Sequence, residues 1–336
     1  MKVSEIGEFG LINRMASITN ISIDKRWKSW RQLVTGIGDD AAVWKPRNPF
    51  QIATVDSMVE DVHFSFKYTT WRELGWKSIA VNLSDIAAMG GVPMYALISL
   101  GLPENTDVKD VAALYEGMTD ATELFQVSIV GGDTVSSPFV FVSVTLLGCA
   151  SNEQGNTLTR SSACPGDKIA VTNSLGASAA GLTMLSNSLE FPAEAAAELR
   201  RAHLKPMPRI AEGQILVATG VKAGMDISDG LVGDMTHICE MSKVGARLNI
   251  DLVPVAPAAV QCFGGQALQF ALNGGEDYEL LFTAPARTIR RVQRALDCAV
   301  TVVGEVTTAH PGKVELVDRE GRAIDLRKAG WDHFSR

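Results

Sequence analysis

The sequence predicts a two-domain protein of the α/β or α+β class. Its 336 residues correspond to about two domains of roughly 150 residues each. Segments typical of strands and of amphipathic helices alternate in both halves, which is the pattern of sheets covered by helices. A polar stretch rich in Gly and Asn, SNEQGNT at 151–157, separates the halves. We therefore expect one domain over 1–150 and a second over 151–336.

The first half combines β-branched segments with two amphipathic segments. Strands are expected at 51–59, 94–102, 127–132 and 139–150. Helices are expected at 71–89 and 108–125, where apolar residues recur at helical spacing. Thr70 and Glu73 form a capping box at the start of the first helix, and Gly90 ends it.

The second half repeats the alternation with shorter elements. Strands are expected at 167–173, 222–228 and 278–285. Helices are expected near 176–188, 193–204, 208–219, 231–241 and 258–272. A short helix and two further strands close the chain.

The composition is that of a globular protein without a membrane span. Hydrophobic residues make up 46% and charged residues 21%, which suffices for a buried core. No apolar stretch reaches the roughly 18 residues that a transmembrane helix needs. The first residues, MKVSEIGEFGLINRM, lack the apolar segment of a signal peptide. We therefore expect a cytoplasmic protein that does not bind a membrane.

Charge and cysteine content argue against two further classes. The net charge is −7 and no basic cluster exceeds two residues, so nucleic acid is not an expected partner. The five cysteines are widely spaced and lack a CxxC pair, which argues against a disulfide framework or a zinc site. Both observations fit a protein of the reducing cytoplasm.

Aspartates recur in short motifs where an apolar run stops. They are Asp39, Asp40, Asp56, Asp85, Asp133, Asp226 and Asp229. If several converge, two carboxylates about 4 Å apart repel by roughly 4 kcal/mol at an effective dielectric constant near 20. Divalent cations relieve this repulsion, and Mg²⁺ binds through a few carboxylates plus substrate phosphates. The pattern therefore predicts a magnesium–polyphosphate site.

Each aspartate also has a purely structural interpretation. Asp beside Gly is common in turns, and Asp226 with Asp229 precedes a helix as an N-cap pair would. Asp85 is explained least well in this way, because it lies inside a predicted helix one turn from Val81 and Met89. A carboxylate on such an apolar face needs a partner.

Familiar catalytic motifs do not occur in the chain. It contains no GxxxxGK[ST] phosphate loop, no HRD or DFG of protein kinases, and no HExxH or GxSxG. The residues alone therefore leave three classes open: a phosphoryl transferase, a metal-dependent phosphohydrolase and a non-catalytic domain stabilised by calcium.

Four other residues have both a structural and a functional interpretation. His63 is either a half-buried histidine or a ligand contact, and Arg160 is either a surface charge or a phosphate clamp. Trp331 either packs the C-terminal segment or forms an aromatic wall for a ring. Tyr115 lies on a helical core stripe, which favours a place in the core.

The acidic motifs belong to a longer ordered set. The set is GIGDDAAV, VDSMVEDVHF, AVNLSDIAAMGGVP, GGDT, LTRSSACPGD, HLKPMPRI, DISDGL, GGEDYELLFT and GWDHF. In this order and spacing the set resembles the thiamine-monophosphate kinase family. That family belongs to the aminoimidazole-ribonucleotide synthetase-like superfamily of ATP-using enzymes. The resemblance covers nearly the whole chain.

The resemblance implies phosphorylation of thiamine monophosphate to thiamine diphosphate by ATP. The γ-phosphoryl group would be transferred directly and in line, with several Mg²⁺ ions and no general base. It also implies a homodimer of two-domain chains. An N-terminal mixed sheet with helices would bind ATP and magnesium and form the dimer, and a C-terminal α/β domain would complete the nucleotide and substrate site.

The resemblance assigns roles to particular residues. The Mg²⁺ ligands would be Asp39, Thr54, Val55, Asp56, Asp85, Asp133, Asp226 and Asp229. The ATP site would be lined by Tyr115, Gly132, Asp133, Arg160 and Ser228. Thiamine monophosphate would be contacted by His63, Glu276 and Trp331. Val55 stands where the family often has Thr, so it would contribute only its backbone carbonyl.

Other members of the superfamily fit less well. A selenophosphate synthetase would need a reactive cysteine near the N-terminus, and the first cysteine here is Cys149. A hydrogenase-maturation relative would need a C-terminal cysteine, and this chain ends WDHFSR. Another ATP-using synthetase of the superfamily remains the nearest alternative.

Overall fold

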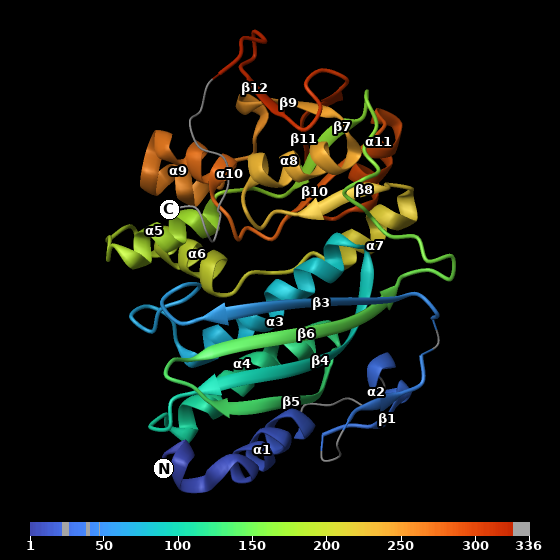
Figure 1. The fold of residues 1–336 in the computed structure, drawn as a ribbon. Helices are drawn as coiled ribbons and strands as arrows, with labels where there is room; N and C mark the ends of the chain where they lie inside the picture. Colours follow the sequence, from blue (N-terminus) through green and yellow to red (C-terminus); the bar gives the residue numbers. More distant parts are fainter. Residues whose placement is uncertain (22–26, 38–40, 47, 325–336) are drawn as a thin grey trace. The chain divides into compact units, whose positions relative to one another are not determined.

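The computed structural model describes residues 1–21, 27–37, 41–46 and 48–324. The chain divides into two compact units (Figure 1). Unit 1 comprises Met1–Ile86 and Val92–Gly155, and unit 2 comprises Ala87–Gly91 and Asn156–Arg336. The chain passes from unit 1 to unit 2 inside the polar stretch 151–157.

Unit 1 is built on a four-stranded mixed sheet with the strand order β3-β6-β4-β5. The strands are β3 (Gln51–Val59), β4 (Gly91–Leu102), β5 (Ser128–Ser136) and β6 (Phe141–Ala150). β3 pairs antiparallel with β6, whereas β4 pairs parallel with β5. The predicted strands are confirmed, and β4 begins earlier than expected because Gly90, at φ 65°, turns the chain directly into the sheet.

Two long helices, α3 (Trp71–Ala88) and α4 (Val108–Phe125), cover one face of this sheet (Figure 1). The capping box is confirmed, since Thr70 N–H donates to Glu73 Oε2 at 2.9 Å and Glu73 N–H donates to Thr70 Oγ1 at 3.2 Å. The helices touch through glycines. A Cβ at Gly75 would lie 1.9 Å from the carbonyl oxygen of Leu114, and one at Gly117 would lie 1.9 Å from that of Arg72.

The N-terminal region of unit 1 adds small elements that the sequence analysis did not anticipate. They are α1 (Val3–Ile21), α2 (Lys28–Gln32), β1 (Leu33–Thr35) and β2 (Val43–Trp44). Gly7, at φ 68° and ψ 175°, kinks α1, and β1 pairs antiparallel with β2. Across the described ranges, no helix combines the length and the apolar character that crossing a membrane requires.

Unit 2 contains a six-stranded sheet with the order β12-β9-β11-β7-β10-β8. The strands are β7 (Lys168–Thr172), β8 (Ala223–Asp226), β9 (Gly245–Asn249), β10 (Leu280–Ala284), β11 (Val300–Thr307) and β12 (Val314–Val317). Only the β9–β12 pair is parallel; the other neighbours run antiparallel.

Helices bury both faces of this second sheet, as the α/β prediction requires. They are α5 (Ala177–Ser186), α6 (Ala193–Leu204), α7 (Ile210–Thr219), α8 (Leu231–Ser242), α9 (Pro257–Phe263), α10 (Ala267–Asn273) and α11 (Ala286–Ala295). Along β10, Leu281 packs in a buried cluster with residues of α8. Its neighbours Leu280 and Phe282 pack in a second cluster with residues of α7 and α11.

One predicted element is wrong in its continuity. The helix expected near 258–272 is two helices, α9 and α10, joined by a 3₁₀ turn over Gly264–Gln266. Gly264 takes φ 55° and ψ −127°, a conformation that a helix cannot contain and that glycine adopts most readily. All five cysteines are free thiols, as their spacing predicted.

The glycine contact between α3 and α4 gives a first prediction. Gly117→Ala should lower the melting temperature by at least about 2 °C, because its Cβ has to displace the backbone of α3. Gly265→Ala is the control, since a Cβ there has nothing within 4 Å. Differential scanning calorimetry of both variants checks this, and equal melting temperatures would contradict the close packing.

Candidate functional site

Unit 1 brings two of the predicted carboxylates together. Asp56 lies on β3 and Asp85 on α3. Thr54 Oγ1 donates a hydrogen bond to Asp85 Oδ2, and Asp56 N–H donates to Asn82 Oδ1 at 3.0 Å. Asp85 therefore has the polar partner that its place in an apolar helix required.

The electrostatics of this pair favour a bound cation. Loss of surrounding water, followed by the negative charge of Asp85, raises the pKa of Asp56 to about 6. Asp56 is exposed, so a cation can reach its carboxylate. Such a cation would offset the charge of Asp85 and so lower the pKa of Asp56. Carboxylate and hydroxyl oxygens fit Mg²⁺, which completes its shell with water and phosphate oxygens.

The pair alone does not make a complete metal site. Among the residues that the structure describes, no three carboxylate, imidazole or thiolate groups converge closely enough to hold an ion. Asp39 lies outside the described residues. The remaining ligands of a cation held by Asp56 and Asp85 would therefore be oxygens of Thr54, of Val55, of water or of substrate.

Asp133 lies apart from this pair in the sheet. It is on β5, opposite Ser99 of β4, and the two strands β6 and β4 lie between β5 and β3. At about 4.8 Å between neighbouring strands, β5 lies about 14 Å from β3, measured across the strands. Next to it, Gly132 is required for packing, since a Cβ there would lie 2.0 Å from the carbonyl oxygen of Ile98.

Two other predicted residues of unit 1 have clear surroundings. Tyr115 of α4 is buried, as its place on the helical stripe predicted, and this burial raises the pKa of its hydroxyl. His63 is half-buried, and its Nδ1 accepts a hydrogen bond from Val59 N–H at 3.1 Å. The neutral ring therefore carries its proton on Nε2.

Unit 2 brings the motifs DISDGL and GGEDYELLF side by side. Glu276 N–H donates to the Ser228 carbonyl at 2.8 Å, and Tyr278 N–H donates to that of Ile227 at 2.9 Å. Ile227 N–H donates in return to the Glu279 carbonyl at 2.8 Å. Backbone hydrogen bonds thus join the two segments that carry the predicted residues, which are Asp226, Ser228, Asp229 and Glu276.

A carboxylate that the sequence analysis missed organises the first segment. Asp234 of α8 is fully buried, and its Oδ2 accepts N–H bonds from Ser228, Asp229 and Gly230 at 3.0, 3.1 and 3.1 Å. The N-cap residue of α8 is Gly230, so the interpretation of Asp226 and Asp229 as an N-cap pair is wrong. An acidic residue in the first turn of a predicted helix was the available signal.

The environment of Asp234 is unfavourable for a charge. Burial, followed by the charges of Asp226 and Asp229, raises the pKa of Asp234 to about 8. Its Oδ1 is buried and has no hydrogen-bond partner among the described residues. Three acidic groups therefore lie near one end of β8, and a proton on Asp234 relieves part of their mutual repulsion.

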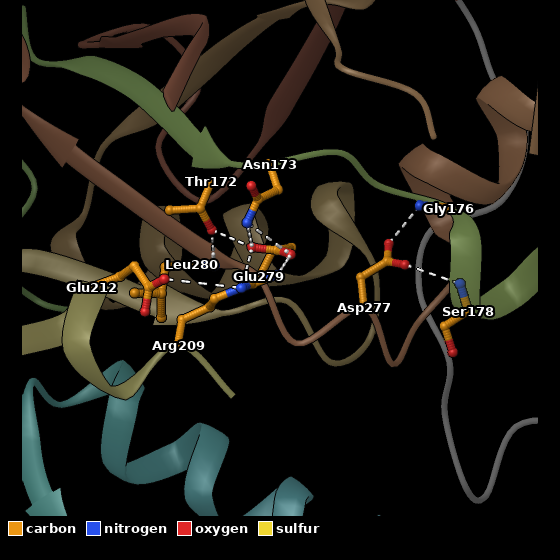
Figure 2. A network of polar contacts seen from close by, with 9 residues as sticks. All are labelled: Thr172, Asn173, Gly176, Ser178, Arg209, Glu212, Asp277, Glu279 and Leu280. Carbon is orange, nitrogen blue, oxygen red and sulfur yellow. Dashed lines mark hydrogen bonds and ion pairs between the residues drawn. The ribbon is translucent and has the colours of Figure 1, made fainter. Parts of the chain in front are cut away.

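Two further carboxylates fix the second segment (Figure 2). Glu279 accepts bonds from Arg209 Nε and Nη2 at 2.9 and 2.6 Å, and from Thr172 Oγ1 at 2.6 Å. Asp277 accepts the N–H groups of Gly176 and Ser178 at the start of α5, at 2.6 and 3.2 Å. Burial is the main cause that raises the pKa of Asp277 to about 7.

The last predicted residues are an exposed arginine and an undescribed tryptophan. Arg160 is exposed, and it follows a segment that runs beside β8, because Thr159 N–H donates to the Lys222 carbonyl at 2.9 Å. Arg160 thus directly follows a residue that is hydrogen-bonded beside β8, the strand that ends at Asp226. Trp331 lies outside the described residues.

Comparison with known proteins identifies the family. Two family models match the chain. The N-terminal domain of AIR synthase related proteins matches residues 38–150, and their C-terminal domain matches residues 164–317. The thiamine-monophosphate kinase of Buchnera aphidicola subsp. Schizaphis graminum is 35% identical over 336 residues, covering 98% of this chain and 99% of the relative. This chain belongs to the thiamine-monophosphate kinase family.

Solved structures of thiamine-monophosphate kinases share the fold of this chain. The enzyme of Stenotrophomonas maltophilia K279a aligns with a TM-score of 0.81 and 33% identity, covering 95% of this chain and 98% of its own. AaThiL complexed with AMPPCP and TMP aligns with a TM-score of 0.76 and 33% identity, covering 99% of both chains. The predicted two-domain fold and the predicted enzyme class are confirmed.

The buried Asp234 of this family member gives a second prediction. Because its folded pKa of about 8 lies above the unfolded value of 3.8, charging Asp234 costs stability as the pH rises from 3.8 through 8. Asn cannot ionise, so Asp234→Asn escapes this loss. The melting temperature of Asp234→Asn relative to the unaltered protein should rise by at least about 3 °C from pH 5 to pH 9.

The measurement is thermal unfolding in a chelating buffer, which keeps divalent cations away from the three acidic groups. A difference that stays constant with pH, or that falls, would show that Asp234 is ionised throughout the range.

Proposed function

We propose that the protein transfers the γ-phosphoryl group of ATP to thiamine monophosphate and releases thiamine diphosphate and ADP. The observation that carries the proposal is the AaThiL complex, in which a relative with the same fold holds AMPPCP, an ATP analogue, together with TMP. The alignment covers 99% of both chains, so both units of this chain have counterparts in that complex.

The chemistry of the acceptor suits the residues of this chain. A phosphate monoester has a second pKa near 6 and is already anionic at neutral pH, so no general base has to remove a proton. The P–O bond to ADP breaks while a bond to the acceptor phosphate oxygen forms, in line. Two anionic groups approach each other, and the demand on the protein is alignment and neutralisation of charge.

Magnesium ions, when bound, supply that neutralisation. The residues that we propose to hold them are Asp39, Thr54, Val55, Asp56, Asp85, Asp133, Asp226 and Asp229. Both acidic clusters favour such binding, because each contains carboxylates whose repulsion a cation relieves. The separation of Asp133 from Asp56 along the sheet fits more than one metal position.

The remaining assignments follow the family resemblance. The ATP site would be lined by Tyr115, Gly132, Asp133, Arg160 and Ser228. Thiamine monophosphate would be contacted by His63, Glu276 and Trp331. We further propose that the protein is a cytoplasmic homodimer. The Val59 N–H bond to Nδ1 fixes the orientation of the His63 ring, which suits a side chain proposed to contact the substrate.

One assay separates this function from its alternatives. Purified protein is incubated with ATP, magnesium and thiamine monophosphate, and the products are resolved by chromatography. Thiamine diphosphate with ADP supports the kinase. Inorganic phosphate released from the monophosphate points to a phosphohydrolase, and ADP formed without thiamine diphosphate points to another synthetase of the superfamily.

The acidic pair of unit 1 gives a third prediction. Asp56→Asn should lower kcat by at least about 100-fold, because it removes a charged metal ligand from the transferring phosphates. Asp61→Asn is the matched control. Asp61 is exposed and lies two residues after the end of β3, at φ 57°, a conformation that Asn tolerates. Near-normal turnover of Asp56→Asn would remove this residue from the site.

The raised pKa of Asp56 gives a fourth prediction. Below about pH 6 a proton competes with the cation, so the magnesium dissociation constant should rise about fourfold from pH 8 to pH 5.5. Magnesium titration followed by thermal unfolding, without nucleotide, measures this. Asp56→Asn should abolish the pH dependence, and an unchanged dependence in that variant would assign it to another group.

A further inference from the structure

The motif HLKPMPRI at 203–210 contacts the acidic motif of residues 274–282 at two places, through His203 and through Arg209. His203 Nδ1 lies 3.3 Å from Glu276 Oε2, and Arg209 Nη2 lies 2.6 Å from Glu279 Oε1. The Arg209 contact belongs to the buried network around Glu279 (Figure 2). The His203 contact instead reaches a carboxylate that remains partly open, since Glu276 is 29% exposed.

His203 is held rigidly in the last turn of α6. It is 2% exposed, and its Nδ1 also lies 3.1 Å from Ser178 Oγ in the first turn of α5. The N–H of Ser178 donates to Asp277, the neighbour of Glu276 in the chain. Contacts thus run from Ser178 through His203 to Glu276, and return from Asp277 to Ser178.

The backbone of Glu276 is constrained as well. Glu276 and Tyr278 take φ of 68° and 53°, which side chains with a Cβ rarely adopt. Asp277, between them, anchors the loop to the start of α5, and Glu276 N–H is bound to the Ser228 carbonyl. Unfavourable backbone angles that the surroundings enforce are typical of functional positions. The carboxylate of Glu276 is therefore fixed through both its backbone and its side chain.

We propose that His203 is a positioning residue that fixes the Glu276 carboxylate to accept a hydrogen bond from the amino-bearing ring of thiamine monophosphate. The inference rests on the proposed function and adds a source of substrate specificity to it. A long, flexible Glu side chain loses rotamer freedom when it binds a ligand, and the imidazole contact removes that loss in advance. The fixed acceptor also disfavours any ring that presents another acceptor at that place.

The alternative is that His203 only fills the core and satisfies Ser178. That role predicts a loss of stability without a change in substrate preference. The proposed role predicts a change in preference for the ring and leaves ATP binding nearly unaltered.

The test compares His203→Leu with His203→Asn, two side chains of nearly the same shape. Asn carries an amide group near the position of Nδ1, whereas Leu cannot hydrogen-bond. Ser178→Ala is the control, because it removes the hydroxyl contact of His203 and leaves the Glu276 contact. Each protein is assayed with thiamine monophosphate and with oxythiamine monophosphate, in which an oxygen replaces the ring amino group, after its melting temperature has been measured.

The unaltered protein should prefer thiamine monophosphate by at least about 100-fold in kcat/KM. In His203→Leu the KM for thiamine monophosphate should rise about tenfold or more, the KM for ATP should change by less than about threefold, and the preference should narrow. His203→Asn should recover most of the preference, and Ser178→Ala should keep it. If His203→Leu does not fold, Glu276→Gln, which leaves the core intact, should show the same narrowed preference.

Turnover with an unchanged preference in His203→Leu, or in Glu276→Gln where Leu does not fold, would overturn the inference while the proposed function stands. Equal rises in the KM for thiamine monophosphate and the KM for ATP would also overturn it. If the unaltered protein formed no thiamine diphosphate, the proposed function would fall and this inference with it.

Discussion

Repulsion between neighbouring carboxylates is the constraint that the structure around the acidic clusters of both units has to overcome. Burial, followed by the charge of Asp85, raises the pKa of Asp56 in unit 1, and burial, followed by the charges of Asp226 and Asp229, raises that of Asp234 in unit 2. A proton or a bound cation relieves the repulsion between such groups. The same chain surrounds them with backbone N–H groups and hydroxyls, which hold the carboxylates in place but neutralise them only partly. A bound divalent ion would complete the neutralisation, as proposed above.

Rigid supports keep the carboxylates close despite this repulsion. In unit 1 Asp85 sits on a helix whose glycine contact with α4 fixes it backbone to backbone. In unit 2 three N–H bonds to Asp234 hold the segment that carries Asp229, and Glu279 with Arg209 holds the segment that carries Glu276. Each support is built from local geometry that charge repulsion cannot readily open. Cluster geometry and fold stability are consequently linked, since weakening a support would let the carboxylates separate.

Local patterns in the sequence predicted much of this arrangement. The capping box of α3, the need of Asp85 for a partner and the alternation of strands and helices were all legible from neighbouring residues. Contacts between distant segments were not: Arg209 and Glu279 are 70 residues apart, and nothing local pairs them. The place of Asp133 was hidden for the same reason, because it depends on the strand order β3-β6-β4-β5 and not on its own motif. Asp234 was missed although acidic residues in a first helical turn are common, since its three N–H donors precede the helix.

The positive charge of Arg209 in unit 2 is used within an ion pair. Arg209 is only partly exposed, and its guanidinium is bound in two places by Glu279. An ion pair of this kind stabilises the segment that carries Glu276, but it leaves little field for an incoming polyphosphate, because the carboxylate cancels the charge. A lysine or arginine fixed among Asp226, Asp229 and Asp234 would be cancelled in the same way. A divalent ion is different, because it can be coordinated by carboxylate and phosphate oxygens at the same time and so link the phosphates to carboxylates that would otherwise repel them. Acidic clusters that bind such an ion would therefore suit a reaction in which both the donor and the acceptor are phosphates.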